Sequence, residues 1–317
     1  MTVPAGLPER VVIRDVGPRD GLQPEAAVAV ADRVRLVEAL VAAGLSHIEI
    51  AAFVSPKAVP AMAGAADVFA AVPAAPGLTR AALVPNAKGA QLALAAAADE
   101  LTVTVSASET YNRRNVNMSS AESEEAIAEI VALAAAGTEV DPWPVPVDAV
   151  ISCAFGSPYE GEIEPSEVAA LAERLAAAGV TSLTYADTTG MATPRRIHEV
   201  LDAVGASGLA PAGGSTGMHL HDTRGTALVN AFAALERGVS RFDTSVGGLG
   251  GSPFAHGAGG NLATEALVAL LDDLGVETGI DIEALLVAAA LIEELVGRPV
   301  PSGVAHHGPR SRRAATA

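Results

Sequence analysis

The sequence predicts an α/β protein with a (β/α)₈ (TIM) barrel fold, because short apolar strands alternate eight times with helical segments. Each unit pairs a short β-branched or apolar run with a longer segment whose apolar residues recur at helical spacing. The eight units occupy roughly 270 residues, a usual size for this fold. Eight regular repeats favour closure into a barrel over the alternative, a doubly wound open sheet.

The repeats can be assigned in order along the chain. We expect strands at 11–16, 47–51, 79–84, 100–105, 145–153, 181–186, 214–220 and 241–246. We expect helices at 29–43, 60–71, 87–97, 121–136, 165–178, 194–205, 226–237 and 262–274. Gly44 ends the first helix, and Pro165 lies in the first turn of the fifth.

The connections and the C-terminus complete this prediction. The polar segment 106–119 is expected to be a loop, and 282–296 an additional C-terminal helix. Residues 247–260 form a glycine-rich loop after strand eight, which suits a lid. Residues 1–298 are therefore expected to form one catalytic domain. Residues 299–317 are rich in Pro, Gly, Arg and Ser, and are expected to be a flexible tail.

Composition narrows the possible functions. The net charge of −17 and the 3% aromatic content argue against a nucleic-acid partner. The single cysteine, Cys153, is expected to be a buried core thiol, and it suits a reducing cytoplasm. We expect neither a signal peptide nor a membrane span, because the apolar segments are interrupted by charges, Gly or Pro.

Polar residues at the ends of the predicted strands form a candidate metal site. Side chains two residues apart in a strand share one face, so His219 and His221 point the same way. In this fold the active site lies at the C-terminal ends of the strands, where Asp20 and Asn261 also fall. Two nitrogens, one carboxylate and one amide oxygen suit Mg²⁺ or Mn²⁺, and the lack of a nearby thiolate disfavours zinc.

Each of these residues also has a purely structural interpretation. The histidines could cap the end of a strand, Asp20 could cap a turn, and Asn261 could be a helix N-cap. Arg19 could stabilise a developing enolate oxygen, or it could pair with Glu49. The glycine-rich loop does not match the phosphate-binding patterns, so it gives no support for nucleotide binding.

Several longer motifs indicate a family. They are DVGPRDGLQPE at 15–25, FVSPKAVP at 53–60, SCAFGSPYEG at 152–161, HLHDTRGTAL at 219–228 and GGLGGSPFAHGAGGNLATE at 247–265. With these motifs the chain resembles the 3-hydroxy-3-methylglutaryl-CoA lyase family, within the metal-dependent barrel lyases and Claisen-type synthases. The Arg-Asp and His-x-His pairs occur across the wider group, whereas the other motifs are more specific to the lyases.

The resemblance implies a function and roles for individual residues. Mg²⁺ or Mn²⁺ would be held by Asp20, His219, His221 and Asn261, and Arg19 would stabilise the enolate of acetyl-CoA. Asp20 or His219 would move protons in a retro-Claisen cleavage of a 3-hydroxyacyl-CoA. The residues expected to orient or bind the substrate are Glu49, Asp187, Asn115 and Lys57. A homodimer is also implied.

Ser252 departs from the family pattern, because the residue after GGLGG is normally a catalytic cysteine. A serine hydroxyl is a poorer proton donor than a thiol. The chain could therefore be a slow lyase, with water or His219 as the proton donor, or it could act on a different 3-hydroxyacyl-CoA. It could also be a condensing aldolase or synthase, or a silent binding protein that keeps the metal.

Overall fold

The structure, a computed structural model, describes residues 3–137, 143–209, 216–251 and 259–310. Eight parallel strands form a closed barrel in which each strand pairs with its neighbours in sequence order, and β8 pairs with β1. The strands are β1 Val12–Asp15, β2 His47–Ala52, β3 Thr79–Leu83, β4 Glu100–Ser106, β5 Val147–Ser152, β6 Ser182–Asp187, β7 Thr216–Leu220 and β8 Arg241–Thr244. The predicted fold is therefore confirmed.

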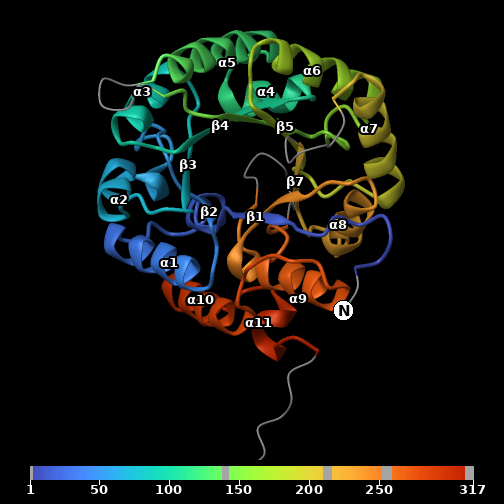
Figure 1. Ribbon diagram of the computed structural model, residues 1–317. Helices are drawn as coiled ribbons and strands as arrows, with labels where there is room; N and C mark the ends of the chain where they lie inside the picture. Colours follow the sequence, from blue (N-terminus) through green and yellow to red (C-terminus); the bar gives the residue numbers. More distant parts are fainter. Residues whose placement is uncertain (1–2, 138–142, 210–215, 252–258, 311–317) are drawn as a thin grey trace, which may run out of the picture.

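Helices surround the barrel as an outer ring (Figure 1). They are α1 Val30–Ala42, α2 Ala65–Ala71, α3 Ala87–Ala95, α4 Glu109–Val116, α5 Ser120–Ala135, α6 Pro165–Ala177, α7 Pro194–Ala206, α8 Ala227–Leu235, α9 Thr264–Leu274, α10 Ile282–Val296 and α11 Gly303–His307. The additional helix α10 packs against α1 and α9. Among the described helices, none combines the length and the apolar character that a membrane span requires.

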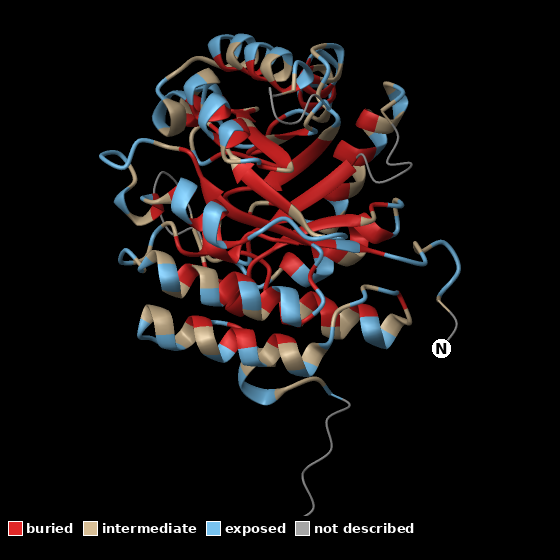
Figure 2. Ribbon diagram, turned by 60° about the vertical axis from the view of Figure 1, so that its left-hand side comes forward, coloured by how far each residue is buried: buried red, intermediate tan, exposed pale blue. Residues whose placement is uncertain are grey.

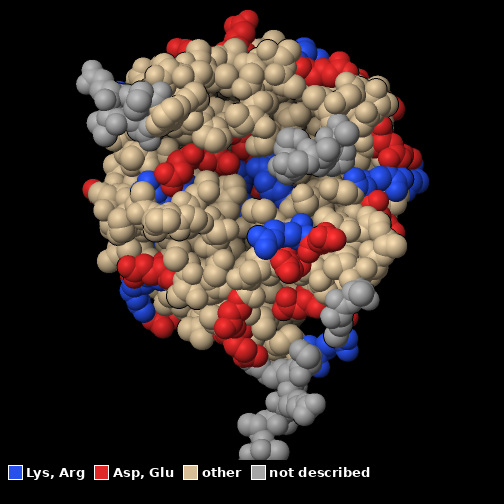
Figure 3. All heavy atoms as spheres, in the orientation of Figure 1, with Lys and Arg blue, Asp and Glu red and all other residues tan. Residues whose placement is uncertain are grey.

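The core lies between the strands and the inner faces of the helices. The strands are almost entirely buried, whereas the helices are buried mainly on the side that faces the barrel (Figure 2). On the face shown in Figure 3, acidic and basic side chains lie in small groups separated by uncharged surface. That distribution offers no extended basic area on this face for a polyanion.

Ionic side chains fill part of the barrel interior. Arg14 on β1 is fully buried and forms ion pairs with Glu100, Asp148 and Asp243, which belong to three other strands. Arg241 adds a second cation at Asp148, at 2.6 Å. This network links four strands across the barrel interior. Each carboxylate in it is paired with an arginine, so none is left as an unpaired buried charge.

Two predictions about the connections were wrong. The segment 106–119 is not all loop, because it contains α4, which begins after the N-cap Ser108 and ends at Asn117 in the left-handed conformation. The predicted helix 60–71 is divided into a 3₁₀ turn, Pro60–Met62, and α2, because Gly64 has a φ of +77°.

The flexible tail predicted for 299–317 also needs correction. Val300 and Ser302 are buried, and Ser302 caps the short helix α11 through the backbone N–H of Ala305. His306 hydrogen-bonds through Nε2 to the carbonyl of Val300 at 2.8 Å. Apolar burial and capping therefore hold the first part of this segment on the barrel, while residues 311–317 lie outside the described residues.

Candidate metal centre and active site

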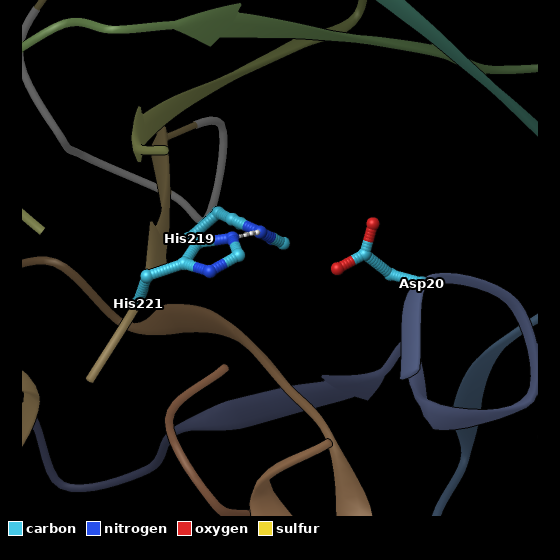
Figure 4. A group of neighbouring side chains, drawn as sticks. All are labelled: Asp20, His219 and His221. Atoms are coloured by element: carbon cyan, nitrogen blue, oxygen red, sulfur yellow. Dashed lines mark hydrogen bonds between the residues drawn. The ribbon is translucent and has the colours of Figure 1, made fainter. Parts of the chain in front are cut away.

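Three metal-ligating side chains converge at the C-terminal end of the barrel. Asp20 comes from the turn after β1, His219 from β7, and His221 from the residue just beyond β7. One ligand atom from each lies within 4.8 Å of the others. Figure 4 shows the Asp20 carboxylate facing the two imidazoles from the opposite side of the site. The structure thus brings together three of the four predicted ligands.

The turn that carries Arg19 and Asp20 is a single π-helical turn, Gly17–Gly21. Asp15 holds its start, because its Oδ1 accepts a hydrogen bond from the Gly17 N–H at 2.7 Å. The turn also packs tightly against Ser245, since a Cβ atom at Gly21 would lie 2.6 Å from the serine Oγ. The spacing of glycines in this motif therefore lets the turn approach the end of β8 closely.

The two imidazoles are oriented by different partners. Nδ1 of His219 lies 3.2 Å from Oδ2 of Asp243, and Nδ1 of His221 lies 2.9 Å from the carbonyl oxygen of Gly259. Because both partners are acceptors, each Nδ1 must carry a proton. The two Nε2 atoms then face each other at 3.1 Å. When both imidazoles are neutral, these two nitrogens present lone pairs to the same point, where either a shared proton or a metal ion can bind.

Asn261 completes the donor set. Its Nδ2 donates to Oδ2 of Asp20 at 2.7 Å and to the carbonyl of Leu249 at 2.9 Å. Its Oδ1 is buried and has no hydrogen-bond partner among the described residues. An unpaired buried amide oxygen beside a carboxylate is available to a cation. The alternative role as a helix N-cap is wrong, because the N-cap of α9 is Ala263.

Arg19 is held by two carboxylates. Its Nε donates to Oε2 of Glu49, which is fully buried, and its Nη1 donates to Oδ1 of Asp20 at 2.6 Å. Its Nη2 has no hydrogen bond to the described residues, so it remains able to donate to a ligand in the cavity. Arg19 can therefore pair with Glu49 and also donate a hydrogen bond to a ligand in the cavity.

These contacts set the charge of the site. Burial alone would raise the pKa of Asp20, but the charges of Arg19 and the two histidines and the Asn261 amide lower it to about 2. Burial opposes protonation of His219, but the hydrogen bond and charge of Asp243 raise the pKa of that imidazole. Burial, reinforced by the neighbouring His219, lowers the pKa of His221 to about 4.

A cavity of about 110 Å³ lies next to these groups. Of the residues predicted from the sequence, its walls include Arg19, Asp20, His219, His221 and Asn115. Further polar residues of the wall had not been predicted as site residues, and they are Gln23, Thr104, Tyr111, Ser152, Thr188 and Asp243. Alternation along β4 and β5 could have found Thr104 and Ser152, because their hydroxyl oxygens meet at 3.1 Å inside the barrel.

Three residues expected to contact the substrate do not line this cavity. Glu49 lies behind Arg19, and Lys57 is exposed on the segment after β2. Oδ1 of Asp187 accepts hydrogen bonds from the backbone N–H groups of Met191 and Ala192, so this carboxylate holds the loop after β6. Burial raises the pKa of Asp187 to about 6.

The two remaining sequence predictions concern Cys153 and Ser252. Cys153 is buried and free, and burial raises the pKa of its thiol to about 12, which fits an unreactive core residue. Ser252 lies outside the described residues.

The fold and the site together define a (β/α)₈-barrel protein with a candidate divalent-metal centre at the mouth of the barrel. The chain belongs to the HMGL-like family, whose model matches residues 10–292. This family of carbon–carbon lyases is metal-dependent.

Individual relatives cover nearly the whole chain. Hydroxymethylglutaryl-CoA lyase YngG of Bacillus subtilis is 42% identical over 93% of this chain and 96% of its own. A 3-hydroxy-3-isohexenylglutaryl-CoA/hydroxy-methylglutaryl-CoA lyase of Pseudomonas aeruginosa is 42% identical over 92% of this chain and 95% of its own. The solved structure of an HMG-CoA lyase from Acinetobacter baumannii, in complex with coenzyme A and 3-methylmalate, has a TM-score of 0.90 at 36% identity and covers 100% of both chains.

Proposed function

We propose that this protein cleaves 3-hydroxy-3-methylglutaryl-CoA to acetyl-CoA and acetoacetate. The observation that carries the proposal is the convergence of Asp20, His219 and His221 at the barrel mouth, beside Arg19. The relatives named hydroxymethylglutaryl-CoA lyases match nearly the full length of the chain, which supports the same reaction here.

The metal in this proposal is Mg²⁺ or Mn²⁺, held by Asp20, His219, His221 and Asn261. The free Oδ1 of Asn261 and the opposed Nε2 atoms of the histidines support this set. Oxygen and imidazole donors without a thiolate favour these ions over zinc. When bound, the ion supplies Lewis acidity, which lowers the pKa of a hydroxyl group that it coordinates.

The protein groups then perform the cleavage. Asp20, in the cavity wall, is proposed to accept the proton of the substrate 3-hydroxyl. His219 is the alternative acceptor, but only through the Nε2 that would otherwise hold the metal, because its Nδ1 already carries a proton. The hydroxyl oxygen becomes the ketone of acetoacetate as the bond between C2 and C3 breaks, and the bonding electrons pass to the thioester as an enolate. Arg19 is placed to donate through Nη2 to this enolate oxygen, since Glu49 and Asp20 occupy its Nε and Nη1.

Proton delivery to the enolate carbon completes the reaction and yields acetyl-CoA. We assign this step to Ser252, on the resemblance of its position in the glycine-rich motif. A hydroxyl is less acidic than a thiol, so this proton transfer is expected to be slower than with cysteine.

Binding of the CoA moiety belongs to the same proposal. Asn115 lines the cavity, and it lies on α4 beside Arg114, whose guanidinium stacks 4.6 Å from the ring centre of Tyr159. We propose that Asn115 contacts the substrate near the thioester. The exposed Lys57 would meet the phosphates of CoA as a mobile cation.

A homodimer in the cytoplasm completes the proposal. Analytical ultracentrifugation at micromolar concentration tests the dimer. We expect a mass of about twice that of the 31.7 kDa chain. A purely monomeric species would contradict it.

The function is tested by incubating the protein with 3-hydroxy-3-methylglutaryl-CoA and following the products by mass. We expect equal amounts of acetyl-CoA and acetoacetate, loss of activity after EDTA treatment, and recovery with Mg²⁺ or Mn²⁺. The 3-isohexenyl analogue is the second candidate substrate, because a relative of equal identity is named for both. If the metal-loaded protein releases no acetyl-CoA from either compound, the proposal is wrong.

A further inference from the structure

The two metal-facing histidines differ in what holds them. His221 hydrogen-bonds through Nδ1 to a neutral backbone carbonyl, that of Gly259, whereas His219 meets the carboxylate of Asp243. Asp243 lies one strand away on β8, where it pairs in register with His219 on β7. The carboxylate and the imidazole are therefore placed by adjacent, hydrogen-bonded strands.

Asp243 is itself fixed by Arg14. Nε of Arg14 donates to Oδ1 of Asp243 at 2.8 Å, and Nη2 donates to Oδ2 at 2.7 Å. This bidentate contact fixes the plane of the carboxylate. Oδ2 keeps one further acceptor position, which receives the His219 N–H. Arg14 and Asp243 are both buried, so solvent does not compete for these hydrogen bonds.

Arg14 has little freedom to move. Its Nη1 donates to Glu100 at 2.9 Å and its Nη2 to Asp148 at 2.8 Å, and these residues belong to β4 and β5. Several carboxylates therefore hold Arg14, and of these Asp243 is the one that is hydrogen-bonded to His219.

We propose that the buried Arg14–Asp243 pair positions His219 by fixing its proton on Nδ1 and aiming its Nε2 at the metal. This inference rests on the metal site of the proposed function, and it assigns Arg14 and Asp243 a role as positioning residues. Neither would coordinate the ion. A ligand histidine whose other nitrogen donates to a carboxylate has a fixed tautomer and a more basic ligand nitrogen.

The contacts explain why asparagine cannot replace Asp243. Oδ1 and Oδ2 of Asp243 both accept hydrogen bonds from Arg14, and Oδ2 also accepts from His219. In an asparagine, one of these oxygens becomes an NH₂ group, which would face an arginine donor in either orientation of the amide. Asp243→Asn therefore loses a hydrogen bond to Arg14 in either orientation and replaces the carboxylate that faces His219 with a neutral amide, with almost no change in volume.

The matched control is Glu100→Gln. Glu100 also accepts from Arg14, but no hydrogen bond joins it to His219, and its side chain is 11% exposed. We expect Asp243→Asn to weaken Mn²⁺ binding by about 10- to 100-fold in calorimetry, and Glu100→Gln by less than about threefold. Equal losses in both variants, or no loss in Asp243→Asn, would overturn the inference.

A second measurement is made on the unmodified protein, and a variant serves only to assign the signals. In ¹⁵N-histidine NMR of the metal-free protein at a pH where His219 is neutral, its proton should reside on Nδ1. The His219 signals are identified by their loss in His219→Gln. A proton on Nε2 would overturn the inference. Neither measurement uses an acyl-CoA, so an error in the proposed substrate leaves both results interpretable.

Discussion

Replacing Glu49 with glutamine tests how Arg19 is held for the reaction. Glu49 is fully buried, and the side chain of Arg19 is only 10% exposed, so water cannot replace the lost charge. A hydrogen bond to a charged group contributes about 1.5–3 kcal/mol, and loss of the glutamate charge removes roughly half of that contribution. The loss of about 1–1.5 kcal/mol predicts a fall in kcat of roughly 10-fold, because each 1.36 kcal/mol corresponds to about a factor of ten.

Glu49→Ala should have a larger and different effect. Without Glu49, Asp20 is the carboxylate among the described residues that remains hydrogen-bonded to Arg19, so Arg19 would compete with the metal for that ligand. Leaving a buried charge without its partner typically costs about 3–5 kcal/mol. We therefore expect Glu49→Ala to lose both kcat and Mn²⁺ affinity, whereas Glu49→Gln should lose mainly kcat.

Steady-state kinetics at saturating metal, together with calorimetry of Mn²⁺ binding, distinguishes these effects. The control is Glu277→Gln, which breaks a surface ion pair between Glu277 and Arg10. These side chains are 70% and 75% exposed, so this substitution should leave kcat unchanged. If Glu49→Gln retains the kcat of the unmodified protein, then the Glu49 contact does not orient Arg19 for catalysis.

The other predictions concern stability, the base of the glycine-rich segment and proton delivery. Burial raises the pKa of Asp15 from 3.8 to about 7, so its stabilising contribution is complete below pH 3.8 and is lost as pH rises towards 7. In urea titrations, the free energy of unfolding of the unmodified protein should fall by up to about 4 kcal/mol between pH 4 and 8, and Asp15→Asn should abolish this fall. An unchanged pH dependence in Asp15→Asn would refute this. Gly250→Ala should weaken Mn²⁺ binding, because a Cβ there would lie 2.3 Å from Nδ2 of Asn261 at a φ of +112°; unaltered calorimetry would count against it. Ser252→Cys should raise the lyase kcat, and no gain, with another acyl-CoA cleaved faster by the unmodified protein, would favour a different substrate.

The convergence of the candidate metal ligands was predictable from sequence because local and fold-level rules agree on it. Strand alternation places His219 and His221 on one face, and the barrel rule places Asp20 near them although 199 residues separate Asp20 from His219. Nothing in the local sequence distinguishes Asn261 from an N-cap, and only the observed start of α9 settles that point.

The residues that line the cavity were harder to predict because the direction of a side chain depends on its strand. Asp187 follows Ala186, which lines the cavity, so alternation turns the Asp187 carboxylate away from it. The register between β2 and β3 shifts between Glu49 and Ala51, and simple alternation does not describe such a strand. The helix α4 was missed because Glu109–Val116 is polar and lacks apolar periodicity, although Ser108 is a recognisable N-cap.

The most direct test of the account measures lyase activity and bound metal in the same titration. Metal-free protein is titrated with Mn²⁺ while acetyl-CoA release from 3-hydroxy-3-methylglutaryl-CoA is recorded. We predict that activity rises in proportion to bound metal and reaches its plateau at one ion per chain, and that Asp20→Asn shifts the binding curve and the activity curve together. Full activity without metal, or activity that does not follow occupancy of this site, would contradict the account.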